Sequence, residues 1–390
     1  MLIVQSIIVY GLMIWVMTYC GKIAYNSQYP EGFGEVDMLA DKKISFGSML
    51  TKSYYAIPIL VFCFFAAVRY RVGVDCEAYK QIFNQILYYN GDNLIAPDIE
   101  KGFVMLALLV GLFTNAHYLF MFLLAVLQIS LLYFAFRKYT NITFFLGLSI
   151  FLTGFYWSLM NGIRQNIVAC AFIAMLPLAL NKKWLHFAIA VFIASFMHKS
   201  AFILLPIGYA LYYVPNKIPS VKFQLIAVVI CFLLMNKFDE VLQYISEYAS
   251  FMGYSENRIN AYSMLENTAY TFGFRMFMLY FSYIIAIIYS DKMIDFYNSR
   301  YFTICYNIFF VAICLKLVFY NNFTIGRLLY YLVCFAPVII SATFFYLWKN
   351  NKQNLFIAML ALLLMRTLYE WYAESQNSIF NEAYLYKFDF

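Results

Sequence analysis

Positive charges at the ends of long apolar segments are the residues of this sequence best suited to chemistry. Arg164 and Arg327 each open an apolar run, and Arg275 lies one helical turn inside another. A charge at membrane depth costs a few kcal/mol and usually lines a cavity or a substrate path. A guanidinium also matches phosphate oxygens with two parallel hydrogen bonds. Either each side chain extends to the lipid headgroups as an anchor, or together they bind an anion, and we expect the second.

Groups that could transfer a proton are few. The acids Asp75, Glu77 and Glu100 lie in the first third of the chain, and His198 stands at a turn between two apolar runs. A histidine at such a turn is either structural or a general base, and histidine titrates near neutral pH without help from its surroundings. We expect His198 to be the base, with Asp75 or Glu77 in that role if it is not.

Metal and disulfide chemistry find little support in the sequence. The three histidines are dispersed, and the eight cysteines are scattered singly, mostly in apolar runs and without a CxxC pair. Such spacing matches neither a zinc site nor a disulfide framework. A Gly-rich nucleotide loop is also missing. We therefore expect no metal site, no disulfide framework and no cofactor.

The composition indicates a membrane protein. Of the 390 residues, 64% are hydrophobic and 12% are charged, whereas a soluble domain carries about 25% charged residues. The net charge of +7 is therefore no sign of nucleic-acid binding. Because a helix needs about 20 apolar residues to cross a bilayer, the sequence predicts an all-α polytopic membrane protein with about 12 or 13 transmembrane helices. The predicted spans are 2–20, 53–68, 118–136, 142–160, 164–181, 184–197, 200–213, 221–236, 271–290, 301–320, 325–347 and 353–370.

One apolar run is too short to be a complete span. Residues 103–113 reach a Thr-Asn pair after eleven residues, which predicts a short or re-entrant segment. Neither a fixed-period repeat nor a low-complexity linker divides the sequence. We therefore expect residues 1–390 to form a single transmembrane domain.

The charges of the connecting segments predict which side of the membrane each lies on. Basic connecting segments lie in the cytoplasm by the positive-inside rule, so the turns at 161–164, 198–199 and 321–326 and the loop 237–270 are predicted to face outward. The cations at the apolar ends then share the outward side and would line an outward-facing basic cavity. The basic residues that set this orientation are Arg137, Lys138, Lys182, Lys183, Lys217, Lys222, Lys292, Arg300, Lys349 and Lys352.

Four short motifs follow one another along most of the chain. They are Arg69-x-x-x-Gly73-x-Asp75-x-x-x-Tyr79, Glu100-x-Gly102-Phe103, Gly162-Ile163-Arg164-Gln165 and His198-Lys199-Ser200-Ala201. Each motif is short, but together they are more specific, and in this order they resemble the EpsG family of Wzy-type polysaccharide polymerases.

The resemblance implies a GT-C-like integral membrane glycosyltransferase at the outer face of the bacterial inner membrane. Such an enzyme moves a growing glycan from undecaprenyl diphosphate onto a second lipid-linked repeat unit of O-antigen, capsule or exopolysaccharide. Its partners would be these lipid-linked oligosaccharides, the lipid bilayer and a chain-length regulator protein, with no nucleic acid. The departing diphosphate needs preorganised cations.

The resemblance also implies roles for individual residues. His198 is expected to take the proton of the acceptor hydroxyl, with Asp75 or Glu77 in its place if it does not. Diphosphate binding is expected of Arg164, Arg327, Arg275, Arg69 and Arg71, and other substrate contacts of Gln165, Lys199, Arg258 and Tyr79.

Two other functions fit parts of the pattern. A membrane O-acyltransferase that modifies a surface glycan would also use a histidine among apolar helices, but it would not need so many outward arginines. A flippase for lipid-linked sugars should show internal repeats and charges along a path through the membrane. The sequence has no two similar halves, and its cations gather on one predicted side. We therefore favour the polymerase.

Overall fold

A computed structural model describes residues 2–29, 45–89, 99–235, 237, 273–375 and 384–389 of the chain. Arg258 and nearly all of the predicted loop 237–270 lie outside these ranges. Within them the chain forms helices and no strand. The helices are α1 (Leu2–Gln28), α2 (Phe46–Leu50), α3 (Ser53–Ala67), α4 (Cys76–Tyr88), α5 (Lys101–Gly111), α6 (His117–Ala135), α7 (Thr140–Leu152), α8 (Phe155–Met160), α9 (Ile163–Leu180), α10 (Trp184–Ser195), the 3-10 helix η1 (Lys199–Ile203), α11 (Leu204–Tyr213), α12 (Val221–Leu233), α15 (Phe274–Ile288), α16 (Ser290–Tyr297), α17 (Arg300–Val318), α18 (Phe323–Val333), α19 (Ala336–Lys349) and α20 (Gln353–Ser375).

Several of these helices are long and apolar enough to cross a membrane. Six segments pass on length and composition, namely α1, α6, α9, α17, α20 and the joined pair α18–α19. A seventh is reached if α15 and α16, which are bent by 60°, count as one span. Shorter apolar helices lie between them, among them α3, α7, α10 and α12. The prediction of an all-α polytopic membrane protein is confirmed.

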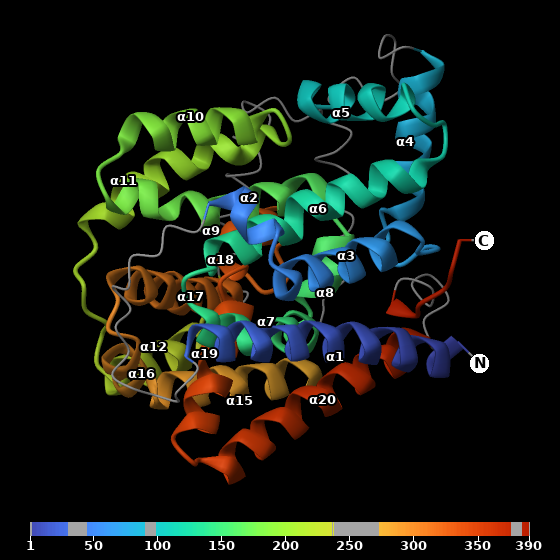
Figure 1. Cartoon of the computed structure of the whole chain (residues 1–390). Coiled ribbons are helices and arrows are strands. Elements are labelled where there is room, and N and C mark those ends of the chain that lie inside the picture. The colour runs from blue at the N-terminus through green and yellow to red at the C-terminus, as the bar shows by residue number, and fades with distance from the viewer. Residues whose placement is uncertain are drawn as a thin grey trace.

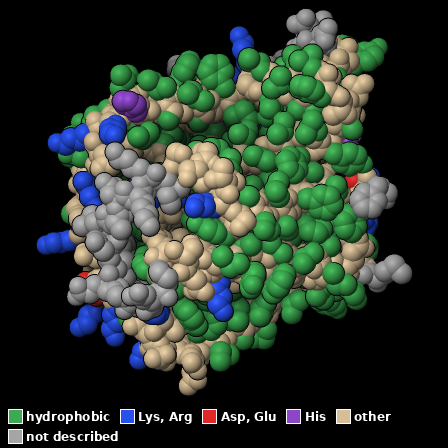
Figure 2. All heavy atoms as spheres, in the orientation of Figure 1, with side chains coloured by type: hydrophobic (Ala, Val, Ile, Leu, Met, Phe, Trp, Pro, Cys, Tyr) green, Lys and Arg blue, Asp and Glu red, His purple; other side chains and the backbone are tan. Residues whose placement is uncertain are grey.

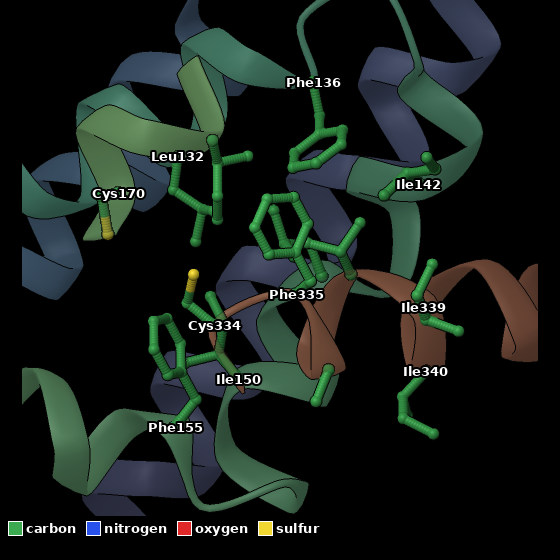
Figure 3. Packing of buried hydrophobic residues seen from close by; sticks show 14 of the residues in the cluster. Leu132, Phe136, Ile142, Ile150, Phe155, Cys170, Cys334, Phe335, Ile339 and Ile340 are labelled. Atoms are coloured by element: carbon green, nitrogen blue, oxygen red, sulfur yellow. The ribbon is translucent and has the colours of Figure 1, made fainter. Parts of the chain in front are cut away.

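The centre of the molecule is built around α7 and α19. α7 packs against α1 and α19, and α9 packs against α6, α10 and α11 (Figure 1). Nearly every residue of α7 and α19 is buried, as expected for helices that are apolar all round. Figure 3 shows buried side chains of several helices filling the space between them. They include Leu132 of α6, Phe136 directly after it, Ile142 and Ile150 of α7, Phe155 of α8, Cys170 of α9, and Ile339 and Ile340 of α19.

The surface divides into an apolar region and a basic edge. In Figure 2 hydrophobic side chains cover a broad area over α3, α5 and α6, whereas Lys and Arg gather at the opposite edge, near α11, α12 and α16. A wide apolar surface is what a lipid bilayer would contact. All eight cysteines are free.

The sequence predicted one of two irregular helical segments, the short helix α5, but not the other, the break between α7 and α8. α5 has eleven residues, as predicted for the short run 103–113. The predicted span 142–160 is instead divided into α7 and α8. The break lies at Gly154, which has a left-handed backbone (φ +81°). A Cβ at Gly154 would lie 3.0 Å from Nη2 of Arg366, so a contact from α20 occupies the space beside the break.

Candidate functional site

The candidate site lies where four helices begin. Asp75, Glu100, Gly162 and His198 directly precede α4, α5, α9 and η1. In Figure 1 the start of α5 lies beside the end of α10, next to the turn that leads to η1. The first N–H groups of a helix have no partner within it, so each of these positions can present polar groups to its neighbours.

The carboxylate of Glu100 is the centre of the site. Its Oε2 accepts a hydrogen bond from Nη1 of Arg164, and its Oε1 lies 2.8 Å from Nδ1 of His198. The backbone N–H of Lys199 also donates to Oε1, at 3.2 Å. The side chain of Glu100 is only 6% exposed. One buried acid therefore holds an arginine and a histidine from two distant parts of the chain.

These contacts fix the charge of the acid and the tautomer of the histidine. Burial alone would raise the pKa of Glu100, but the hydrogen bond with His198 and the positive charge of Arg164 lower it to about 2. Glu100 is therefore a carboxylate near neutral pH. Because a carboxylate only accepts hydrogen bonds, Nδ1 of His198 must carry a proton. In the neutral ring the other nitrogen, Nε2, is then the one able to take a proton.

Gly102 sets the distance between Glu100 and His198. Its N–H donates to the carbonyl oxygen of Phe196 at 3.0 Å, which joins the start of α5 to the end of α10. A Cβ at position 102 would lie 2.7 Å from that same oxygen, so a larger residue would push the two segments apart. The spacing Glu100-x-Gly102 therefore places the acid against the turn that carries His198.

Arg164 is held on more than one side. The Tyr79 hydroxyl of α4 lies within electrostatic range of the guanidinium, and the ring centroid of Tyr79 is 5.9 Å from that of Phe103. The ring centroid of Phe103 lies 5.5 Å from the guanidinium carbon, within cation–π range. With Glu100, these groups come from α4 and α5, while Arg164 itself begins α9. Its side chain remains 18% exposed, so part of the guanidinium is accessible.

Asp75 joins the start of α4 to the start of α9. Its Oδ2 accepts the N–H of Gly162 at 3.1 Å, and its own N–H donates to Oδ1 of Asn161 at 3.0 Å. Gly73 permits this approach, because its φ is +85° and a Cβ there would lie 2.6 Å from the carbonyl oxygen of Met160. The carboxylate of Asp75 thus holds Gly162, the residue directly before α9, and Arg164 follows Gly162 by two positions.

Arg327 lies in α18, beside the start of α9. The side-chain amide of Gln165 donates to its carbonyl oxygen, which ties α18 to the residue next to Arg164. The Tyr330 hydroxyl lies within electrostatic range of both Arg327 and Asp75. A second tie links η1 to α18, where the hydroxyls of Ser200 and Tyr331 are 2.5 Å apart. The structure therefore brings Arg327, Asp75 and the His198 turn to one end of the helices.

Arg69, a second predicted diphosphate ligand, lies inside the protein. It is 2% exposed, and its guanidinium donates to the carbonyl oxygens of Ala66 and Val72, the latter at 2.9 Å. A third donor group lies 3.4 Å from the carbonyl oxygen of Met160. These bonds fold the segment between α3 and α4, which ends at Asp75.

Arg275 lies in a separate cluster at α15 and α20. Its Nη1 is 4.0 Å from Oε1 of Glu370. Arg366 of α20 lies 3.1 Å from the other oxygen of Glu370 and donates to the carbonyl oxygen of Leu152. No contact is recorded between this cluster and Glu100 or His198 among the residues that the structure describes.

The remaining predicted residues have other surroundings. Glu77 lies 3.3 Å from Lys80 on the same helix. Arg71 is exposed and lies over the ring of Tyr70, 5.1 Å from its centroid. The side chain of Lys199 is also exposed, and only its backbone N–H contacts Glu100.

Glu100 is more central in the structure than the sequence indicates. The sequence marks it as an acid within a short motif and predicts proton transfer by His198, Asp75 or Glu77. An acid directly before an apolar helix, two residues ahead of a glycine, was the available signal.

Within the described ranges, no three His, Cys, Asp or Glu side chains gather closely enough to hold a metal ion.

Comparison with known proteins gives the family. The EpsG family model matches residues 52–388, which includes every site residue from Asp75 to Arg327. Members of that family are Wzy-type polysaccharide polymerase-like. No curated protein and no solved structure matches the chain. Because the match covers most of the sequence, the chain belongs to the EpsG family and has a polysaccharide polymerase-type role.

Proposed function

We propose that this protein polymerises glycan repeat units by transferring a growing chain from undecaprenyl diphosphate onto a second lipid-linked unit. The reaction would take place at the outer face of the bacterial inner membrane. The observation that carries the proposal is the Glu100 carboxylate, which holds Arg164 and His198 beside each other. One acid thereby positions a cation for a departing diphosphate and a base for an incoming hydroxyl.

The transfer forms one bond and breaks another. The acceptor hydroxyl oxygen attacks the anomeric carbon of the donor glycan, and the bond from that carbon to the diphosphate oxygen breaks. The acceptor proton passes to Nε2 of His198, while Nδ1–H stays bonded to Glu100. The nearby carboxylate stabilises the imidazolium that forms, as the acid does in a Ser-His-Asp triad. No nucleotide sugar is consumed.

Arg164 supports departure of the lipid diphosphate. A guanidinium has five N–H donors in a fixed plane, and the contacts with Glu100 and Tyr79 leave donors for phosphate oxygens. Because both partners are buried, the guanidinium is already oriented before charge develops on the leaving group, which is the condition for effective electrostatic catalysis. Arg327, tied to α9 through Gln165, is the second ligand that the geometry supports.

Reconstitution in liposomes with defined lipid-linked repeat units tests the proposal. The wild-type protein should convert single units into a ladder of polymers without added nucleotide. Arg164→Ala should leave single units even when the ladder is normalised to folded, inserted protein, because the change also leaves the buried Glu100 without its cation. Arg275→Ala, a matched loss of an arginine outside the Glu100 cluster, should retain the ladder. Full-length polymer from Arg164→Ala would overturn the clamp assignment.

In cells that lack the protein, the state of the lipid-linked repeat units distinguishes the polymerase from the two competing functions. A complete ladder without acyl groups would indicate an O-acyltransferase. Single units stranded on the inner face of the membrane would indicate a flippase. Single units that accumulate on the outer face support the polymerase.

A further inference from the structure

A second polar cluster contains Lys80 of α4, and residues 384–389 form part of it. The Asp389 carboxylate contacts Nζ of Lys80 and lies 2.8 Å from Nε2 of His117. Lys80 also lies 3.3 Å from Glu77. The exposed fractions of the Lys80, His117 and Asp389 side chains are 12%, 18% and 16%, so the cluster is largely shielded from solvent.

The backbone of 384–389 is bonded to the segment that leads to Asp75. Asp389 N–H donates to the carbonyl oxygen of Val68 at 2.9 Å, and Tyr70 N–H donates to that of Lys387 at 2.8 Å. Between these bonds Arg69 and Phe388 form an antiparallel bridge. The segment 384–389 therefore pairs with the chain that runs from α3 to the start of α4.

Tyr386 anchors this segment in the core. It is fully buried, its N–H donates to Oγ of Ser6 at 2.7 Å, and its hydroxyl donates to the carbonyl oxygen of Phe65 at 2.7 Å. Its ring meets that of Tyr10 edge to face. Anchored in this way to α1 and α3, residues 384–389 present Asp389 from a fixed position.

α4 is the element that Asp389 can position. One face of α4 is apolar and packs Phe83 on Phe120 of α6, with ring centroids 4.9 Å apart. Packing holds the apolar face of α4, and the charged contact from Lys80 to Asp389 adds a second restraint on the helix from the segment 384–389. Burial lowers the pKa of Lys80, but its contacts with Asp389 and Glu77 raise it above the usual value, so the ammonium is charged. Lys80 directly follows Tyr79, which contacts Arg164.

We propose that Asp389 is a positioning residue for the transfer reaction, because its contact with Lys80 fixes α4 and thereby holds the Tyr79 hydroxyl against Arg164. The inference rests on the proposed function for its effect on rate, but not for its effect on structure. Asp389 itself touches neither His198 nor Glu100.

Hydrogen–deuterium exchange on the full chain in detergent tests the structural part. Asp389→Asn should raise exchange in residues 68–80 and leave α7 and α19 protected as in the wild type. Asp389→Glu should restore protection in part, and Asp295→Asn, an exposed acid on α16, is the matched control. Unchanged exchange of 68–80 in Asp389→Asn would overturn the proposal.

Polymerisation by the reconstituted protein tests the link to Arg164. Asp389→Asn should slow polymer formation about 10-fold per folded molecule, since small displacements of a catalytic group cost rate. In a Tyr79→Phe background the same change should have less than about a 2-fold further effect, because coupled residues are not additive. Full additivity would overturn the link. If Asp389→Asn loosens residues 68–80 but the wild-type protein makes no polymer, the proposed function is refuted. The structural role of Asp389 at α4 then remains.

Discussion

The structure contains two clusters of arginine and glutamate, and they differ in what the glutamate holds. At the starts of α5 and α9, Glu100 holds Arg164 and His198, whose side chains are 18% and 21% exposed. At α15 and α20, Glu370 lies between Arg275 and Arg366, and Arg366 is 7% exposed. The first cluster combines a cation with a proton acceptor and has an accessible edge. The second pairs charges only.

The comparison shows that a misplaced cation in a membrane helix is not by itself a ligand. Arg164 and Arg366 look alike in sequence, since each lies near the end of an apolar run. Their partners separate them, because Arg366 also donates to the carbonyl oxygen of Leu152 at the end of α7. A guanidinium that satisfies a helix end has a structural use, whereas one beside a histidine can serve a reaction.

The largest effect should come from His198. We expect His198→Ala to lower the rate of polymer formation by about 10²–10⁴-fold, the usual contribution of a general base. The reconstituted ladder, normalised to inserted protein, measures the change. His198→Gln serves as a control of similar polarity and should be nearly as slow. A rate within 3-fold of wild type would remove the chemical distinction between the two clusters.

Arg366 should affect folding and not chemistry. Arg366→Gln leaves Glu370 without its closest cation, and breaking a buried pair costs about 3–5 kcal/mol. We expect a lower thermal midpoint and less protein extracted from membranes, with nearly normal activity per folded molecule. Loss of activity in protein that melts like the wild type would place Arg366 in the substrate site.

The charge of Glu100 should appear in the pH dependence of stability. Its pKa falls from a usual value of 4.5 to about 2 in the folded protein. A carboxyl with a lowered pKa stabilises the fold above its unfolded pKa, and this stabilisation is lost as the pH falls through the folded pKa. The wild type should therefore lose more stability than Glu100→Gln between about pH 4.5 and pH 2. Thermal melting of both proteins across this range measures the difference, and parallel curves would contradict it.

Arg275 should show the smallest effect. Its 4.0 Å contact with Glu370 is loose and its side chain is 33% exposed, and such pairs contribute about 0–1 kcal/mol. Arg275→Gln should shift the thermal midpoint slightly and leave the polymer ladder intact. If this change stops chain extension, Arg275 binds substrate, as the sequence predicted, and the two clusters share one function.

The sequence predicted the helices better than the contacts between them. Apolar length alone indicated the short segment that became α5, because eleven residues do not cross a bilayer. The break at Gly154 was not predicted, and the side chain that lies beside it, Arg366, comes from α20, far along the chain. Between the predicted spans 271–290 and 301–320 the chain forms the helix α16, which is bent by 60° from α15.

For the candidate site, residue types were predictable and partners were not. The position of Arg164 before an apolar helix and the turn at His198 could be read from local sequence. That both meet Glu100 could not, because the contacts join residues 64 and 98 positions apart. Arg69 and Arg164 each accompany short motifs, but only the fold shows that one is enclosed by carbonyl oxygens and the other is accessible.

The long separation of these contacts also has a consequence for biosynthesis. A nascent chain inserts its helices in order, and Glu100 enters before Arg164 and His198 have been made. Glu100 therefore has no cationic partner until α9 and the turn after α10 have been inserted. Since an unpaired carboxylate is costly to bury, the start of α5 should dock only at that stage. Assembly of the reactive centre is then a late event, which follows insertion of the helices that carry it.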